Sequence, residues 1–526
     1  MKKKIINLSA KIIKQLMKKF LFAALLLNSL NLFSQYGDLD STFGTGGKVV
    51  TSINSGADKA YSVALQPDGK IIVAGMTTNS LTGQDFVCIR YNSDGTFDNT
   101  FGTNGIFTND FQTGSDDVVY SLALQSDGKI VLAGYSDDGS NKNAAILRLN
   151  ANGTIDTTFG NSGKILTDFI TGKADEIKVI KIHPLTGALI VGGTSATSTT
   201  QSQAVIARYN STGTLDTTFN TTGIYALPHN TGSGTFYYVI EDLVVKPNGK
   251  ITAVGWINQQ GLQWSANHMA YRLNSNGSLD TSFSTDGVIT VNGNFNADDK
   301  SFSMLLNADD SFLFSGGGNL TSTKYDYFLG LYNATGTSVI GKAFFDYGTL
   351  INDIAYGMGV DSTGKIVMAG SSVTSTTSST FGISRVNADY TIDNSFGSSG
   401  KVTTTFGTNT TNEAFDMAIQ PDDKIIAVGY TGNDIAIARY TGGILATNES
   451  SKISTTGKIY PNPVKTTINI SEELTKQDSS FNIYSLDGKL LLKGNAQDNK
   501  INVQSLMKGI YFIRIGNNQV IKFIKD

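Results

Sequence analysis

Acidic side chains recur at one position of this sequence, twelve residues before a short turn. Counting back from Lys70 and from the matching residues of six further turns gives Asp58, Asp117, Glu176, Tyr238, Asp299, Asp353 and Asn412. Five of these seven residues are acids, and a ring of carboxylates could attract a cation or an amine-bearing ligand. Carboxylates beside turns also cap backbone N–H groups, which is the interpretation that the pattern favours.

Aromatic and imidazole side chains gather in the connection from Ile257 to His268. It is the longest of its kind in the sequence and carries Trp264. An indole on a loop offers a flat apolar face for a sugar ring. Trp264 and His268 are therefore candidate ligand contacts.

Metal-binding and nucleotide-binding motifs are missing from the sequence. The three histidines, His183, His229 and His268, have no metal-ligand spacing, and Cys88 lies in an apolar run that favours burial over reactivity. No glycine-rich phosphate loop follows a strand and opens a helix. We expect no zinc site, no nucleotide and no cofactor beyond a cation at the mouth of a central channel.

Arginine and aspartate also recur once per repeat. The arginines are Arg90, Arg148, Arg208, Arg272, Arg385 and Arg439, and the aspartates are Asp40, Asp98, Asp156, Asp216, Asp280 and Asp393. Catalysis needs one asymmetric group of residues, whereas a residue found in nearly every repeat usually has a structural task. We therefore predict structural ion pairs and no catalytic residue among them.

These residues belong to a repeat of about 59 residues that runs from Leu39 to Tyr440. Seven copies share a turn such as Pro67-Asp68-Gly69-Lys70, a strand that ends near the arginine, and a loop of the form Leu-Asp-x-Thr-Phe-Gly. Each copy reads as four short antiparallel strands, the pattern of a propeller blade. The predicted fold is all-β: a seven-bladed β-propeller, with a solenoid as the alternative.

The two ends of the repeat region favour a closed ring. The region begins with the strand from Lys48 to Ile53 and stops after the strand from Ile435 to Tyr440, where an equivalent strand should follow. We predict that the N-terminal strand completes the last blade. The turns and the Leu-Asp-x-Thr-Phe-Gly loops then share one face, and the variable connections share the opposite face, where binding is expected.

The repeat resembles the delta-60 family of bacterial surface and secreted proteins. The resemblance rests on Leu39-Asp40-Ser41-Thr42-Phe43-Gly44 and Gln66-Pro67-Asp68-Gly69-Lys70, and it covers residues 35–445. It implies a β-propeller-like body and no defined activity.

The N-terminus has the features of a signal peptide. Lys18 and Lys19 precede the apolar run from Phe20 to Leu27, and we predict cleavage of residues 1–34, with Met17 as an alternative start. No later segment has about 18 consecutive apolar residues, so no membrane-spanning helix is expected in the mature chain. The net charge of −3, with both signs scattered, gives no indication of nucleic-acid binding.

The last part of the sequence differs from the repeats. A polar linker at 446–457 leads to residues 458–526, which read as a small β-sandwich. This segment resembles the type A C-terminal sorting domain of the type IX (Por) secretion system of Bacteroidetes, on the residues Tyr460, Pro461, Asn462, Pro463, Gly509, Tyr511, Lys522 and Lys525. The resemblance implies the type IX machinery and its surface peptidase as partners, and a secreted or outer-membrane surface location.

These observations predict an exported, non-catalytic propeller that binds a glycan, a protein or a cation on its variable face. The first alternative is a polysaccharide hydrolase or lyase, which would need carboxylates, or His229 and His268, to converge at the channel mouth. The second alternative is a structural adhesin. The identity of the ligand does not follow from the sequence.

Overall fold

The computed structural model describes residues 36–198, 200–227, 235–260, 266–290, 299–318, 325–347, 352–375, 377–442, 459–460, 464–471, 479–485, 490–506, 509–515 and 520–525. The predicted signal peptide and linker lie outside these residues. The chain divides into two compact units, Met1–Ile444 and Leu445–Asp526. Every regular element described is a β-strand, and no described helix is long and apolar enough to cross a membrane.

The described part of the first unit folds into seven four-stranded antiparallel sheets, here called blades 1 to 7. Blade 1 contains β2 (Asp58–Leu65), β3 (Ile71–Asn79), β4 (Gly83–Tyr91) and β5 (Ile106–Asn109). Blade 2 contains β6 (Asp116–Leu124), β7 (Ile130–Asp137), β8 (Lys142–Leu149) and β9 (Lys164–Thr167). Blade 3 contains β10 (Asp175–Ile182), β11 (Leu189–Ser198), β12 (Gln201–Tyr209) and β13 (Ile224–Ala226).

The remaining blades repeat this order. Blade 4 contains β14 (Thr235–Val245), β15 (Ile251–Gln260), β16 (Ala266–Leu273) and β17 (Val288–Thr290). Blade 5 contains β18 (Lys300–Leu306), β19 (Phe312–Gly318), β20 (Asp326–Tyr332) and β21 (Val339–Phe345). Blade 6 contains β22 (Asp353–Val360), β23 (Ile366–Ser375), β24 (Ser378–Val386) and β25 (Lys401–Thr404). Blade 7 contains β26 (Asn412–Ile419), β27 (Ile425–Thr431), β28 (Asp434–Tyr440) and, from the N-terminal end, β1 (Lys48–Thr51).

The core consists of apolar layers between neighbouring blades. The middle strands read as continuous apolar runs because both of their faces are covered: Ile71, Val73 and Val87 pack with blade 7, whereas Ile72 and Ala74 pack with blade 2. The phenylalanine of each Leu-Asp-x-Thr-Phe-Gly loop, such as Phe101, is fully buried between blades. The repeated motif therefore supplies a core residue at each blade junction.

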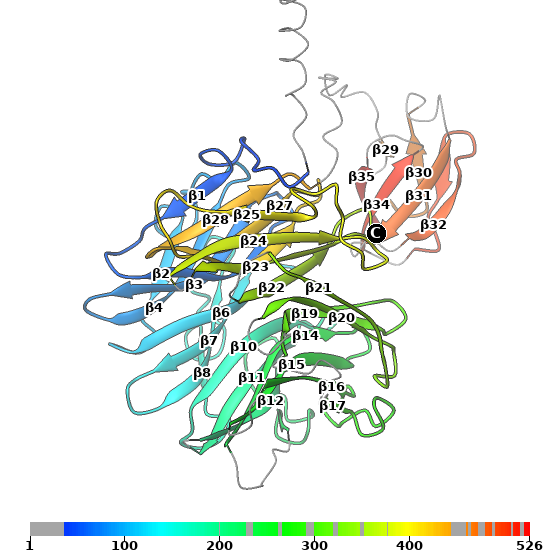
Figure 1. Cartoon of the computed structure of the whole chain (residues 1–526). Coiled ribbons are helices and arrows are strands. Elements are labelled where there is room, and N and C mark those ends of the chain that lie inside the picture. The colour runs from blue at the N-terminus through cyan, green and yellow to red at the C-terminus, as the bar shows by residue number, and fades with distance from the viewer. Residues whose placement is uncertain are drawn as a thin grey trace, which may run out of the picture. The chain divides into compact units, whose positions relative to one another are not determined.

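The ring closes where the sequence predicts. β1 pairs antiparallel with β28, from Lys48 opposite Ala438 to Thr51 opposite Ile435, and Figure 1 draws the two strands side by side. A second link joins blade 7 to blade 1 near the axis, because the Asp416 carboxylate accepts a hydrogen bond from the Val63 N–H at 2.9 Å. The first and last repeats are thus joined both at the outer edge and at the axis.

The second unit has two sheets in its described residues. One contains β29 (Ile459–Tyr460), β30 (Thr467–Ile470) and β33 (Lys500–Asn502). The other contains β31 (Ser480–Ser485), β32 (Leu490–Asn495), β34 (Gly509–Ile515) and β35 (Val520–Lys525). The two sheets enclose one apolar core with Ile468, Ile483 and Ile513 among its buried members, which is the two-layer arrangement predicted for this segment.

Candidate functional site

The first strand of each blade lines a central cavity. This cavity has a volume of about 440 Å³, and residues of all seven inner strands, β2, β6, β10, β14, β18, β22 and β26, form its wall. Ligand cavities usually have volumes of roughly 300 to 1,000 Å³. The axis of the propeller therefore carries a cavity of ligand size.

A β-bulge in each inner strand aims one side chain at the axis. The ladder between the first and second strands skips one residue in every blade, for example between Ala60 and Ser62. Bulges re-aim side chains in this way. The skipped residues, here called the axial ring, are Tyr61, Tyr120, Lys178, Glu241, Phe302, Tyr356 and Phe415, and all of them line the cavity.

Glycine on the second strand makes each bulge possible. A Cβ on Gly75 would lie 1.9 Å from the Lys59 carbonyl oxygen, and a Cβ on Gly370 would lie 1.9 Å from that of Ile354. Any larger residue would push the bulge away. The equivalent glycines in the other blades are Gly134, Gly193, Gly255, Gly316 and Gly429.

Five neighbouring members of the axial ring form a continuous aromatic arc. The ring centroids are 5.3 Å apart for Tyr120 and Tyr61, 5.0 Å for Tyr61 and Phe415, 5.3 Å for Phe415 and Tyr356, and 4.8 Å for Tyr356 and Phe302. These edge and tilted contacts are favourable for aromatic pairs. Blades 2, 1, 7, 6 and 5 thus supply an apolar wall.

Blades 3 and 4 supply charge to the same ring. The Lys178 ammonium lies 2.6 Å from the Glu176 carboxylate and 3.7 Å from the Tyr120 ring centroid, and Lys142 contacts Glu176 at 2.8 Å. Burial alone would raise the pKa of Glu176, but attraction to Lys178 and Lys142 outweighs it and lowers the pKa. Glu241 accepts a hydrogen bond from the Trp256 indole at 2.8 Å, and burial raises its pKa. Titratable groups of both signs therefore converge on one side of the cavity.

The acids predicted from turn spacing lie mostly between blades, away from the cavity. Asp58 and Asp117 are fully buried. Asp58 accepts hydrogen bonds from the Ile53 N–H at 2.7 Å and the Thr77 hydroxyl at 2.5 Å, and Asp117 accepts one from the Phe111 N–H at 2.5 Å. These are the contacts that the capping interpretation expects.

In blade 3 the buried, capping residue is Asp175, one position before Glu176. The turn between β10 and β11 spans His183 to Ala188, whereas the turn of blade 1 spans only Gln66 to Lys70. Counting back from a turn that is one residue longer shifts the result by one position. Glu176 consequently contacts Lys178 of the axial ring and Lys142, although it does not itself line the cavity.

The other spacing-derived residues are also buried. Tyr238 packs in the apolar core of blades 3 and 4, and Asp299 and Asp353 are 4% and 0% exposed. Asp353 accepts a hydrogen bond from the Tyr347 N–H at 3.2 Å. None of these three residues faces the 440 Å³ cavity.

His268 lies inside β16, because the hairpin with β15 is tighter than the sequence indicates. It is 1% exposed, stacks 4.0 Å from the Phe314 ring and shares a hydrogen bond with Ser301. Burial lowers its pKa to about 3, so the imidazole stays neutral. Trp264 and His229 lie outside the described residues.

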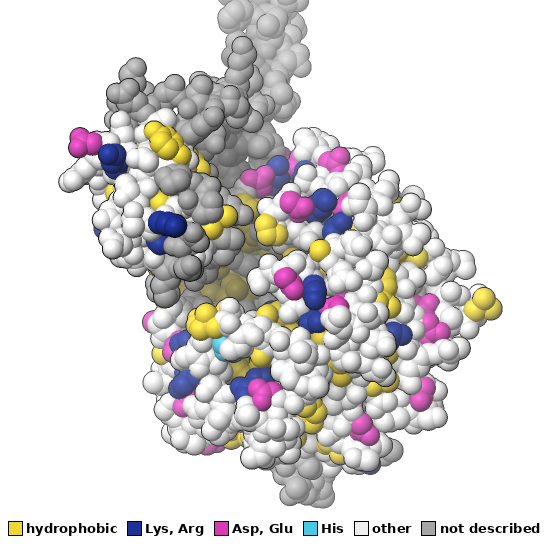
Figure 2. Space-filling model, turned by 180° about the vertical axis from the view of Figure 1, so that it is seen from behind, with side chains coloured by type: hydrophobic (Ala, Val, Ile, Leu, Met, Phe, Trp, Pro, Cys, Tyr) yellow, Lys and Arg dark blue, Asp and Glu magenta, His cyan; other side chains and the backbone are white. Residues whose placement is uncertain are grey.

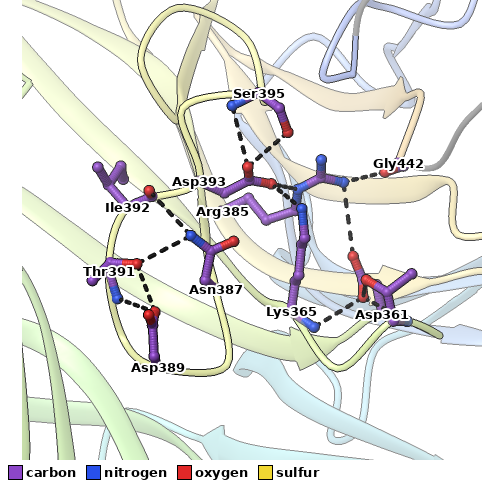
Figure 3. A network of polar contacts seen from close by, with 11 residues as sticks. Asp361, Lys365, Arg385, Asn387, Asp389, Thr391, Ile392, Asp393, Ser395 and Gly442 are labelled. Atoms are coloured by element: carbon purple, nitrogen blue, oxygen red, sulfur yellow. Dashed lines mark hydrogen bonds and ion pairs between the residues drawn. The ribbon is translucent and has the colours of Figure 1, made fainter.

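The repeated arginines brace the opposite face. In blade 6, Arg385 Nε and Lys365 Nζ contact the Asp393 carboxylate at 2.7 and 2.8 Å, and the Arg385 guanidinium also donates to the Gly442 carbonyl (Figure 3). Ser395 completes the loop by donating to Asp393 through its N–H and hydroxyl. The guanidinium lies 4.7 Å from the centre of the Phe396 ring.

Equivalent pairs recur in other blades, as predicted. Arginine and aspartate are 2.7 to 2.9 Å apart in Arg90–Asp98, Arg148–Asp156, Arg208–Asp216 and Arg439–Asp40. In blade 4, Asp280 pairs with Lys250 at 2.7 Å, and Arg272 donates to the Ala334 carbonyl of the next repeat. Each arginine reaches a carbonyl of a neighbouring repeat, so these residues join blades.

The second unit presents several of the predicted sorting residues. Gly509 and Tyr511 lie in β34, Lys525 ends β35, and Tyr460 is 56% exposed in β29. Tyr511 packs against Phe523 in the core. Lys522 also lies in β35, whereas Pro461, Asn462 and Pro463 are outside the described residues.

The surface carries charges of both signs. In the view of Figure 2, Lys and Arg side chains alternate with Asp and Glu across the described residues, without a large patch of one sign. The described residues on this face therefore form no basic patch of the kind that a polyanion would need.

Two family models match the chain. The C-terminal residues 458–525 match the Secretion system C-terminal sorting domain. The Domain of unknown function (DUF5122) beta-propeller matches residues 66–101, 125–159, 186–219, 246–283, 362–396 and 420–442. The sequence-based prediction of a propeller-repeat family followed by a secretion sorting domain is confirmed.

Solved structures add only distant similarities. The WD40 beta-propeller domain of Doa1 is 12% identical, with 76% of this chain and 98% of that chain covered and a TM-score of 0.42. PorZ of Porphyromonas gingivalis is 13% identical, with 89% and 59% covered and a TM-score of 0.39. Virginiamycin B lyase of Staphylococcus aureus is 12% identical, with 74% and 98% covered and a TM-score of 0.42. No curated protein matches the chain.

Proposed function

We propose that this chain, whose body is built of DUF5122 β-propeller repeats and whose C-terminus is a secretion-system sorting domain, is an exported protein that binds a glycan in its axial cavity. The sorting domain indicates export to the cell surface or the medium. The predicted signal peptide would supply the first step across the inner membrane. Passage through the type IX machinery, removal of the sorting domain by its peptidase, and release or attachment at the surface complete the proposal.

The axial ring is the observation that supports glycan binding. Its aromatic arc offers apolar faces to the C–H side of a sugar ring, and Lys178 and Glu241 offer a donor and an acceptor for hydroxyl groups. Mixed aromatic and polar walls suit an amphipathic ligand better than a purely apolar one. A small inorganic cation would not need five aromatic side chains for its recognition.

Binding without catalysis fits the charged residues best. Glu176 is held between two ammonium groups and Glu241 accepts a hydrogen bond from Trp256, so both carboxylates already have partners within the protein. The second candidate is a polysaccharide hydrolase or lyase. It is favoured by one fact, that the pKa of Glu241 is raised while that of Glu176 is lowered, as in acid and base pairs.

A glycan array followed by a turnover assay on the same polysaccharides tests this proposal with the full chain. We expect binding without product release, and we expect Tyr356→Ala to weaken it by about 10-fold or more, because a stacking face is lost. Phe97→Ala, at an exposed aromatic residue on the opposite face, should leave binding unchanged. Product release that Glu241→Gln abolishes would establish the hydrolase or lyase instead, and equal loss in both aromatic variants would remove the cavity from the proposal.

A further inference from the structure

Three carboxylates meet at the junction of blades 1 and 2, away from the axial cavity. Asp85 lies near the start of β4, Asp110 directly follows β5, and Asp117 lies in β6. One carboxylate oxygen from each can be chosen so that all three lie within 4.8 Å of one another. Asp85 and Asp117 are buried, whereas Asp110 is half-buried and gives access to solvent.

One carboxylate oxygen of Asp85 has no hydrogen-bond partner. The side chain is 5% exposed; its Oδ2 accepts a hydrogen bond from the Thr82 hydroxyl at 2.7 Å, but its Oδ1 is fully buried and has no hydrogen-bond partner. A buried carboxylate oxygen without a partner is costly. An orphaned carboxylate oxygen within a group of carboxylates is a donor that a hard cation takes.

A cationic side chain beside this group, Lys164, contacts backbone carbonyls instead of a carboxylate. Lys164 Nζ donates to the carbonyl oxygens of Asp110 and Phe111 at 3.2 and 2.9 Å. Three carboxylates and one ammonium leave two negative charges, which a divalent ion would neutralise.

The same arrangement occurs a second time in the fold. Asp326, Asp346 and Asp353 form the other such group among the described residues, at the junction of blades 5 and 6. The positions correspond: Asp85 and Asp326 stand five residues before Arg90 and Leu331, and Asp110 and Asp346 stand seven residues before Asp117 and Asp353. The same group of three aspartates therefore occurs at equivalent positions of two blade junctions.

We propose that Asp85, Asp110 and Asp117 bind a calcium ion that fastens blade 1 to blade 2. All donors are oxygens, with no histidine or cysteine, which excludes the preferences of zinc. Calcium accepts irregular sets of carboxylate, amide and water oxygens, whereas magnesium demands octahedral geometry and keeps its waters. This site is independent of glycan binding in the axial cavity.

Equilibrium dialysis of the EDTA-treated full chain against calcium chloride tests the site. We expect saturable binding with a Kd of about 10⁻⁴ to 10⁻³ M, as in extracellular modules, and a higher Tm with calcium than with EDTA. Asp85→Asn should bind one equivalent fewer than the unmodified chain. In EDTA it should melt at the same temperature or higher, because one of three mutually repelling charges is gone.

Asp434→Asn is the matched control. Asp434 stands five residues before Arg439, as Asp85 does before Arg90, but at that junction Ser52 stands in the place of Asp110. It should bind as many equivalents as the unmodified chain. Asp110→Asn, at the half-buried position, serves as the second variant if Asp85→Asn fails to fold. No calcium binding, an unchanged number of equivalents in both aspartate variants, or an equal response to magnesium chloride would overturn the proposal.

Discussion

Arg385 is the most buried of the repeated arginines, and its partners are buried with it. Its side chain and that of Asp393 are 2% and 6% exposed, whereas those of Arg208 and Asp216 are 14% and 24% exposed. Removing one partner of a buried pair leaves an uncompensated charge, but an exposed partner regains water. The same motif residue should therefore matter to different degrees in different blades.

We predict that Arg385→Ala lowers the free energy of unfolding by about 3 kcal/mol, because the Gly442 carbonyl loses its donor and the buried Asp393 carboxylate keeps only Lys365 and Ser395. The matched variant Arg208→Ala should cost less than half as much. Urea denaturation of both variants, followed by tryptophan fluorescence, measures the difference. Equal losses would mean that burial of the pair does not set its contribution.

Recurrence in the sequence was sufficient to predict these ion pairs, because one residue type fills one position in nearly every repeat. The axial ring could not be predicted in this way. Its members are tyrosine, phenylalanine, lysine and glutamate, so no residue type marks the position. The available signal was indirect: the glycine of each second strand, such as Gly75, which permits the bulge.

At the scale of elements, β1 is the strand that closes the ring. It is short, but the segment before it adds contacts: Gly37 N–H donates to the Thr441 carbonyl at 2.7 Å, and Asp40 N–H donates to that of Arg439 at 2.8 Å. Phe43 fills the core between blades 7 and 1. Closure thus combines ladder hydrogen bonds with apolar burial.

Deleting residues 1–53 should lower Tm by about 10 °C relative to a chain that lacks only residues 1–35, because roughly five ladder bonds and one core phenylalanine are lost. The two truncations differ only in the closing segment. Differential scanning calorimetry measures both. An unchanged Tm in the longer deletion would show that the ring does not depend on β1.

Strand positions followed well from the sequence, because turns and alternating apolar residues recur at fixed spacing. In blade 3, counting back from the turn identified the wrong residue as the buried cap, because the turn from His183 to Ala188 holds one extra residue. The length of β15 and β16 was also underestimated, since polar residues such as Gln259 resemble loop residues although they continue the ladder. Tertiary pairing overrode local composition in both strands.

At the scale of the whole molecule, two groups of aspartates have opposite effects on how the free energy of unfolding changes with pH. Burial raises the pKa of Asp175 to about 7 and that of Asp416 to about 6. In the arginine pairs, burial alone would raise the pKa of the carboxyls, but hydrogen bonds and nearby cations lower it, as in Asp98 and Asp156. The first group binds a proton more readily in the folded chain than in the unfolded chain, and the second group less readily.

The free energy of unfolding should therefore be highest near pH 4 to 5. Above this range the raised carboxyls must ionise in the folded chain, so stability falls as the pH rises to about 7. Below 3.8, the ordinary pKa of an aspartate side chain, the paired carboxyls begin to take up protons and their contribution is lost. Denaturation in EDTA buffers from pH 3 to 8 measures both limbs.

Asp175→Asn should flatten the upper limb by up to about 1.4 kcal/mol per pH unit. Blade 7 carries Asn412 at the equivalent position, where it accepts a hydrogen bond from the Phe406 N–H at 3.2 Å, so the amide fits this environment. Asp138→Asn, on an exposed loop, is the control and should leave the slope unchanged. A slope that survives Asp175→Asn would exclude this residue as its origin.

The pairing of β1 with β28 also fixes an order of events during synthesis. The strand that leaves the ribosome first finds its partner only after Ile435 to Ala438 have been made. Until then blade 7 lacks its outer edge, and any prematurely terminated product keeps an unpaired strand at each end. Only a polypeptide synthesised at least as far as Ala438 can pair β1 with β28 and close the ring.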